Sequence, residues 1–300
     1  MIHPIPPTAD STCPMPVLRY NYAMRLFYFL LITFAALIIA VVAMAMIVSG
    51  GQTTASIRIA TLAQDVLLFI IPSILSAIKM SPLPASLLCI DRRPSFPITI
   101  IAIIAMICSI PAMDMLVEWN ENIRLPESLG TLESWMRYSE DNAAAQVEMM
   151  LGGTSTADLI IDILIVGVLA GFSEELFFRG TLQRLISSGR VNHNAAIWIT
   201  AVLFSAFHMQ FFGFFPRLIL GAFFGYLLYW SGSLWLPALL HAVNNSIVVY
   251  TLWHGKLHPD TDINSWGSDS TAIIICSILL TAAAIYILKN INKSRNGVTQ

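Results

Sequence analysis

The sequence predicts an all-α fold, a polytopic membrane helix bundle of about eight transmembrane helices. Of the 300 residues, 56% are hydrophobic and only 11% are charged, whereas soluble domains carry about 25% charged residues. The apolar residues also fall into runs of the length that a bilayer-spanning helix needs, which is ~20 residues. Composition and run length together therefore place the chain in a membrane.

Eight apolar runs are candidate spans, although the sixth is short. The fourth is expected to continue as a helix to about Ser187. By residue number, the predicted spans are 26–48, 59–78, 96–117, 157–178, 195–211, 218–230, 234–252 and 271–288.

The distribution of Lys and Arg predicts the orientation, because cytoplasmic connections carry an excess of these residues. With the N-terminus inside, the inner segments hold 11 of the 16 Lys and Arg residues and the outer segments hold the other five. We therefore expect an integral protein of the cell (plasma) membrane with both the N- and the C-terminus cytoplasmic. The polar, proline-rich start shows no cleavable signal pattern.

The spans divide the chain into five expected parts, of which the middle one is the most unusual. This long connection mixes apolar with acidic side chains, which predicts one or two helices lying along the membrane surface; a solvated linker is the alternative. The parts are a cytoplasmic tail (1–25), three transmembrane helices (26–117), the extracytoplasmic amphipathic connection (118–156), a helix core with the polar residues (157–253), and a last transmembrane helix with a cytoplasmic tail (254–300).

Several residues are expected to have packing roles only. Asp65 lies in an apolar run and suggests a hydrogen bond between helices. Gly221 and Gly225 form a GxxxG pattern, which favours close helix packing. The four cysteines are far apart and form no CxxC pair, so small-hydrophobe packing is favoured over a disulfide framework. They are Cys13, Cys89, Cys108 and Cys276.

Polar side chains interrupt the apolar runs at three places in the core. A charged group near the bilayer centre costs roughly 2.5–3.5 kcal/mol even on insertion scales, so each needs a partner or a function. The residues are Glu174, Glu175 and Arg179 in the fourth span, His208 in the fifth, and His241 and Asn245 in the seventh.

Helix geometry predicts how the first of these groups is arranged. Glu175 and Arg179 are four residues apart and can pair on one helix face. Glu174 points about 100° away from that face and stays free for other work. Glu174 and His208 are each 17 residues from Val191, the centre of the turn between their spans. In an antiparallel helix pair, this spacing predicts that the carboxylate and the imidazole face each other at one depth.

These residue types favour hydrolysis. A carboxylate and an imidazole can hold and deprotonate a water molecule, and a second histidine with an amide can stabilise a developing oxyanion. Glu174, His208 and His241 can alternatively bind a divalent metal such as zinc, although the poor ligand Asn245 favours the oxyanion role. The zincin pattern HExxH and the serine-hydrolase pattern GxSxG are absent. Nothing in the sequence indicates binding to nucleic acid.

Three motifs occur in order on consecutive spans, namely EExxxR, FxxxH and HxxxN. With them the chain resembles the CAAX-protease and bacteriocin-processing (CPBP, or ABI) family of intramembrane endopeptidases. The motifs are Glu174-Glu175-Leu-Phe-Phe-Arg179, Phe204-Ser-Ala-Phe-His208 and His241-Ala-Val-Asn-Asn245.

The resemblance implies an intramembrane endopeptidase that acts on a membrane-associated peptide or protein, either prenylated and CAAX-like or bacteriocin-like. It implies that Glu174 and His208 activate the water and that His241 and Asn245 support the oxyanion, with Glu175 and Arg179 in a supporting role. The family has been described both as metal-dependent and as a metal-free glutamate protease, so the cofactor stays open between no metal and a divalent metal. The alternatives are a non-enzymatic immunity or scaffold protein that retains the motifs and a proton-coupled transporter, although no transporter-like repeat is visible.

Overall fold

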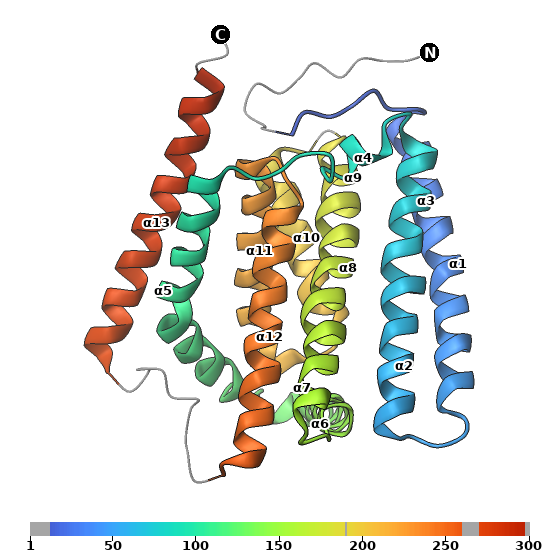
Figure 1. Ribbon diagram of the computed structural model, residues 1–300, viewed down its shortest axis with the longest axis vertical. Helices are drawn as coiled ribbons and strands as arrows, with labels where there is room; N and C mark the ends of the chain where they lie inside the picture. The colour runs from blue at the N-terminus through green and yellow to red at the C-terminus, as the bar shows by residue number, and fades with distance from the viewer. Residues whose placement is uncertain (1–12, 190, 260–269, 298–300) are drawn as a thin grey trace.

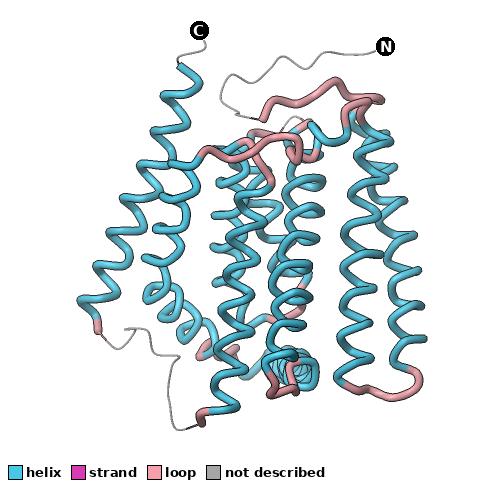
Figure 2. Tube along the Cα trace, in the orientation of Figure 1, coloured by secondary structure: helices cyan, strands magenta, loops and turns pink. Residues whose placement is uncertain are grey.

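The computed structural model describes residues 13–189, 191–259 and 270–297, and these ranges are helical with no strand (Figure 1, Figure 2). The predicted all-α fold is confirmed. Most helices run along the long axis of the bundle (Figure 2).

The long helices lie close to the predicted spans, and two of them are rods that change helix type along their length. The first rod is α2 (Thr54–Gln64), η1 (Asp65–Ile70) and α3 (Ile71–Met80). The second is α7 (Thr156–Asp162), η3 (Ile163–Ala170), α8 (Gly171–Glu175), η4 (Leu176–Gln183) and α9 (Arg184–Ser187). The others are α1 (Tyr22–Val48), α5 (Phe96–Glu121), α10 (His193–Phe207), α11 (Phe214–Ser231), α12 (Trp235–Leu257) and α13 (Thr271–Gly297). Four short or transverse elements connect them: α4 (Pro84–Leu87), η2 (Glu127–Leu129), α6 (Gly130–Met150) and η5 (Phe211–Gly213).

Six helices in the described ranges are long and apolar enough to cross a membrane, so the predicted number of eight is not confirmed. One exception is α10, whose 15 residues extend about 22 Å at ~1.5 Å per residue and fall short of a hydrocarbon core of ~30 Å. The other is α12, which is long enough but carries polar residues such as His241 and Asn245. The fourth span does continue to Ser187, as predicted.

The helices form a central group between two flanking pairs (Figure 1). On one flank α1 packs against the rod of α2 and α3, and on the other α5 packs against α13. The rod from α7 to α9 lies in the centre with α10, α11 and α12 (Figure 1). This central group contains all three motifs.

The central rod contains two π-helical segments, η3 and η4, and the short α8 lies between them. π-helical turns are rare and are frequent at functional sites. Gly167 and Gly171 face α12 from this rod, and a Cβ atom at Gly171 would lie 2.8 Å from the backbone nitrogen of Ala242. The absence of a side chain at Gly171 therefore permits the two helices to approach at the level of His241.

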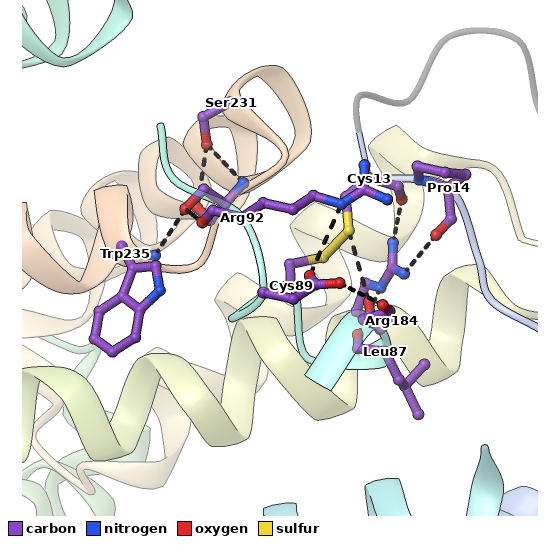
Figure 3. The surroundings of a disulfide bond; sticks show 11 residues. Cys13, Pro14, Leu87, Cys89, Arg92, Arg184, Ser231 and Trp235 are labelled. Carbon is purple, nitrogen blue, oxygen red and sulfur yellow. Dashed lines mark hydrogen bonds and ion pairs between the residues drawn. A yellow bond between two sulfur atoms is a disulfide. The ribbon is translucent and has the colours of Figure 1, made fainter. Parts of the chain in front are cut away.

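The Cys13–Cys89 disulfide corrects the prediction that these two cysteines have packing roles only (Figure 3). Arg184 brings the two chain segments together by donating hydrogen bonds to the carbonyl oxygens of Pro14 at 3.1 Å and Leu87 at 3.0 Å. The backbone oxygen of Cys89 also accepts a hydrogen bond from Leu234, just before α12, at 3.0 Å. The pairing joins residues 76 positions apart, which no local pattern in the sequence indicates.

We expect the Cys89→Ser variant to lose thermal stability, because a disulfide that closes so long a loop contributes up to about 4 kcal/mol in the chain-entropy model. The measurement is the unfolding temperature in detergent, with and without a reductant. Cys108→Ser is the matched control, because Cys108 is not in a disulfide. An unfolding temperature that neither reduction nor Cys89→Ser lowers would contradict a stabilising disulfide.

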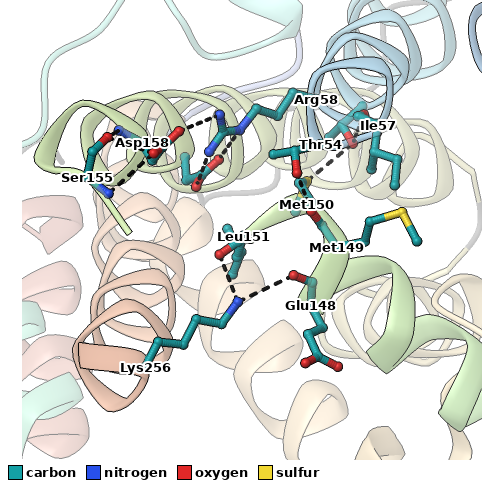
Figure 4. Close-up of polar contacts among 12 residues, drawn as sticks. Thr54, Ile57, Arg58, Glu148, Met149, Met150, Leu151, Ser155, Asp158 and Lys256 are labelled. Carbon is teal, nitrogen blue, oxygen red and sulfur yellow. Dashed lines mark hydrogen bonds and ion pairs between the residues drawn. The ribbon is translucent and has the colours of Figure 1, made fainter. Parts of the chain in front are cut away.

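The predicted amphipathic connection contains one long helix, α6, which Figure 1 views nearly end-on and which therefore crosses the bundle. Figure 4 shows how the end of α6 and the turn after it are attached to two other helices. Thr54 of α2 donates to the carbonyl oxygen of Met149 at 3.0 Å, and Lys256 of α12 donates to that of Leu151 at 2.9 Å. Close by, Arg58 of α2 pairs with Asp158 at 2.9 Å.

Glu133 anchors the start of α6. Its carboxylate accepts hydrogen bonds from the backbone N–H of Leu125 at 2.9 Å and from Arg137 at 2.7 Å. The Leu125 backbone bond, followed by the bond from Arg137, lowers the pKa of Glu133 below its ordinary 4.5. Because the folded pKa is depressed, this contribution is fully present above pH 4.5 and is lost as the pH falls through the folded pKa.

We therefore expect the start of α6 to loosen in acid at a pH below 4.5. The measurement is hydrogen exchange of α6 backbone amides as a function of pH, corrected for the intrinsic exchange rate. Glu133→Gln should show the faster exchange already at neutral pH. Identical profiles for the variant and the wild type would show that Glu133 does not hold this helix.

Candidate active site

Glu174 and Glu175 lie side by side in α8, in the centre of the bundle. The Glu174 side chain is 15% exposed, whereas that of Glu175 is fully buried. Their neighbours come from α10, α11 and α12, so the site depends on contacts between four helices. Each of the two carboxylates has one buried oxygen, Oε2, without a hydrogen-bond partner in the described structure.

Glu175 and Arg179 form the predicted ion pair, with Arg179 Nη1 2.6 Å from Glu175 Oε1 and both side chains fully buried. The Arg179 guanidinium lies over the Phe204 ring at 4.4 Å and near the Phe224 ring at 5.6 Å. It also donates to the carbonyl oxygen of Gly221 at 2.9 Å. Arg179 therefore connects α10 and α11 to the central rod.

His241 lies between the two glutamates. Its Nδ1 is 2.9 Å from Glu175 Oε1, and its Nε2 is 3.7 Å from Glu174 Oε2. The ring stacks on Phe224 with centroids 5.0 Å apart. Since the Glu175 carboxylate already accepts from Arg179, the hydrogen-bond network assigns the donating proton to His241 Nδ1 and directs Nε2 toward Glu174.

His208 and Glu174 form no direct hydrogen bond or ion pair within the described residues, and the expectation from equal spacing around Val191 that they face each other at one depth stays a prediction. His208 Nδ1 bonds to the carbonyl oxygen of Phe204 at 2.9 Å, while Glu174 acts on His208 only at longer range. The central rod has π-helical turns and α10 ends at Phe207, just before His208. After that end, Met209 takes a left-handed backbone conformation with φ 53°.

Asn245 binds the central rod. Its Nδ2 donates to the carbonyl oxygen of Val166 at 3.2 Å, and its Oδ1 accepts from Asn244 at 3.3 Å. Asn245 is four residues after His241 in α12, so the two residues of the HxxxN motif attach this helix to the rod at two levels.

Two charged residues near the site were not among the predicted site residues. Asp65 is buried and accepts a hydrogen bond from Ser173 at 3.2 Å, which confirms the expected contact between helices. Both Asp65 and Arg217 interact electrostatically with Glu174. In the sequence, each of these residues is recognisable only as a single charge in an apolar run. That pattern does not indicate which other residues the charged side chain lies near.

The metal alternative concerns Glu174, His208 and His241. In the part of the chain that the structure describes, no group of three or more His, Cys, Asp and Glu residues is arranged to hold a metal ion. The Nδ1 atoms of His208 and His241 are bonded to protein oxygens. A metal would therefore have to be bound through their Nε2 atoms.

The fold and the site define a class of protein, namely a polytopic helical membrane protein with a carboxylate–histidine cluster among its helices. Residues 156–247 match a family model described as type II CAAX prenyl endopeptidase Rce1-like. This segment contains all three motifs, and the resemblance that they predicted is confirmed for it. The segment is therefore similar to membrane proteases of the CAAX type. Searches of curated proteins and of solved structures gave no match to the chain.

We expect Glu175→Gln to destabilise the protein strongly, because it leaves the buried Arg179 guanidinium without its carboxylate. Removing one partner of a buried ion pair costs about 3–5 kcal/mol. The measurement is the free energy of unfolding in detergent. Glu133→Gln is the matched control, since Glu133 and Arg137 have the same spacing but their side chains are partly exposed, at 16% and 33%.

The double variant Glu175→Gln/Arg179→Met should recover part of the lost stability, because it no longer buries an uncompensated charge. Equal losses for Glu175→Gln and Glu133→Gln would contradict this account of the pair.

Proposed function

We propose that the protein is an intramembrane endopeptidase that hydrolyses a peptide bond of a membrane-associated substrate with a water molecule activated by Glu174 and His208. The observation that carries the proposal is the Glu174 carboxylate. It lies in the segment similar to CAAX proteases, and its buried Oε2 has no hydrogen-bond partner in the described structure. A prenylated CAAX-like peptide is the favoured substrate class, and a bacteriocin-like peptide is the alternative.

Glu174 acts as the general base in this proposal. Its free carboxylate oxygen accepts a proton from water, and the resulting hydroxide attacks the carbonyl carbon of the scissile bond. His208 bonds to the Phe204 carbonyl through Nδ1, so Nδ1 carries the proton and Nε2 can accept a hydrogen bond from the same water. This role requires His208 and Glu174 to share a water rather than to touch each other, which agrees with their longer-range interaction.

His241 and Asn245 would stabilise the negative charge on the carbonyl oxygen. Glu175 fixes the His241 ring through Nδ1, and His241 donates from Nε2 to the oxyanion as an imidazolium, with a proton on both ring nitrogens. Asn245 uses one amide hydrogen for Val166 and retains a second. When the tetrahedral intermediate collapses, Glu174 passes its proton to the leaving amine, which gives a free carboxylate product and a free amine product.

We expect Glu174→Gln and His208→Ala to abolish cleavage while the protein still inserts and folds. Loss of a general acid–base group costs typically 10²–10⁴-fold in rate. The measurement is mass spectrometry of membrane peptides from cells with wild-type or variant protein, together with unfolding temperatures of the purified proteins. Glu127→Gln is the control, because Glu127 is exposed and distant in sequence from the motifs.

Persistent cleavage by both variants would exclude the proposed mechanism. If the wild-type protein cleaves nothing, and the two variants only lower folded yield or partner binding, the non-enzymatic immunity or scaffold role would be favoured instead.

A further inference from the structure

Arg217 is a cation near the site that the proposed mechanism does not use. It lies in the first turns of α11 and donates to the backbone oxygen of Gln210 at 3.0 Å and to its side-chain oxygen at 2.5 Å. Both acceptors are neutral. No ion pair links Arg217 to a carboxylate within the described residues, although Glu140 and Glu174 act on it at longer range.

Arg217 is placed beside the segment that carries His208. Gln210 follows His208 by two residues, directly after the end of α10. The guanidinium also packs against Gly213, where a Cβ atom would lie 2.8 Å from two of its nitrogens. Arg217 acts on His208 as well as on Glu174 through space. The guanidinium therefore lies against the chain that directly follows His208, one of the two proposed water-activating residues.

A cation in a membrane-spanning segment needs compensation, and two neutral oxygens supply only part of it. A guanidinium has five N–H donors in a planar fork that suits a carboxylate. The bonds to Gln210 leave donors for such a ligand. Beyond the Glu175–Arg179 ion pair, the site contains the Glu174 carboxylate, which would repel an anionic substrate group unless a second cation offset it.

We propose that Arg217 binds the C-terminal carboxylate of the peptide substrate, a few residues beyond the scissile bond. The inference rests on the proposed function and names a feature of its substrate. Two to four extended residues reach roughly 7–14 Å, which suits a guanidinium that senses Glu174 without contacting it. Arg217 is thereby a specificity-determining residue that selects bonds close to a free C-terminus.

A purely structural role for Arg217 is the alternative. The bonds to Gln210 brace the segment after His208, and losing this brace would slow cleavage of every substrate equally. The Gln210→Ala variant separates the two roles, because it removes the side-chain acceptor of the brace and keeps the cation. Arg217→Lys keeps the positive charge and is expected to retain part of the preference for a substrate with a free C-terminal carboxylate.

Arg124→Met is the matched control, because Arg124 is a surface arginine whose partner is Glu133.

The experiment compares two synthetic peptides that end in S-farnesylcysteine followed by three residues and that differ only at the C-terminus, a carboxylate in one and a carboxamide in the other. We expect wild-type protein to favour the carboxylate by about 10–100-fold in kcat/KM, as for a hydrogen bond to a charged group. Arg217→Met should abolish the preference, while Gln210→Ala and Arg124→Met retain it. Cleavage with an unchanged preference in Arg217→Met would overturn the proposal and leave the proposed function intact.

If wild-type protein cleaves neither peptide, the proposed function fails for this substrate class, and binding of the same two peptides decides the inference. Tighter binding of the carboxylate that disappears in Arg217→Met supports the carboxylate site. Equal binding of both peptides by wild-type protein overturns it.

Discussion

The buried ion pair between Glu175 and Arg179 is the interaction on which the rest of the site depends. A single carboxylate oxygen of Glu175 accepts from both Arg179 and His241. Since two fully buried charges are tolerated only with good partners, the guanidinium is enclosed by Phe204, Phe224 and the Gly221 carbonyl. The pair therefore ties α10, α11 and α12 to the central rod, and the helices that carry the motifs cannot separate without exposing a charge.

This arrangement divides the work between two neighbouring glutamates. The Glu175 carboxylate binds both Arg179 and His241, and it holds the His241 ring in place. Glu174, one residue earlier, is less buried, and its Oε2 has no hydrogen-bond partner among the described residues. One imidazole can lie between adjacent carboxylates because its two nitrogens point in different directions, and Gly171 lets α12 approach closely enough for it to do so. Supporting and reactive groups are thus separated by a single peptide unit.

The two ends of the bundle are closed in different ways. At one end the Cys13–Cys89 disulfide and Arg184 hold the N-terminal segment and the loop before α5, and this loop is bonded to the start of α12. At the other end α6 crosses the bundle, bonded to α2 and α12. Disulfides are rare in the cytosol, whereas the Lys and Arg distribution predicts that the disulfide end is cytoplasmic. The disulfide and the charge distribution therefore favour opposite orientations of the bundle, which site-specific labelling of its two ends distinguishes.

The sequence by itself determined the features that arise from local physics. Long apolar runs give helices, i,i+4 spacing gives the Glu175–Arg179 pair, and three short motifs mark the segment similar to CAAX proteases. Only the tertiary structure decided which distant groups meet: His241 with Glu174 and Glu175, Cys13 with Cys89, and Arg217 with Gln210. These contacts depend on π-helical turns, on the early end of α10 and on a glycine that permits close helix packing. Such effects shift a side chain by a few ångströms, and the spacing of residues along the sequence does not predict these shifts.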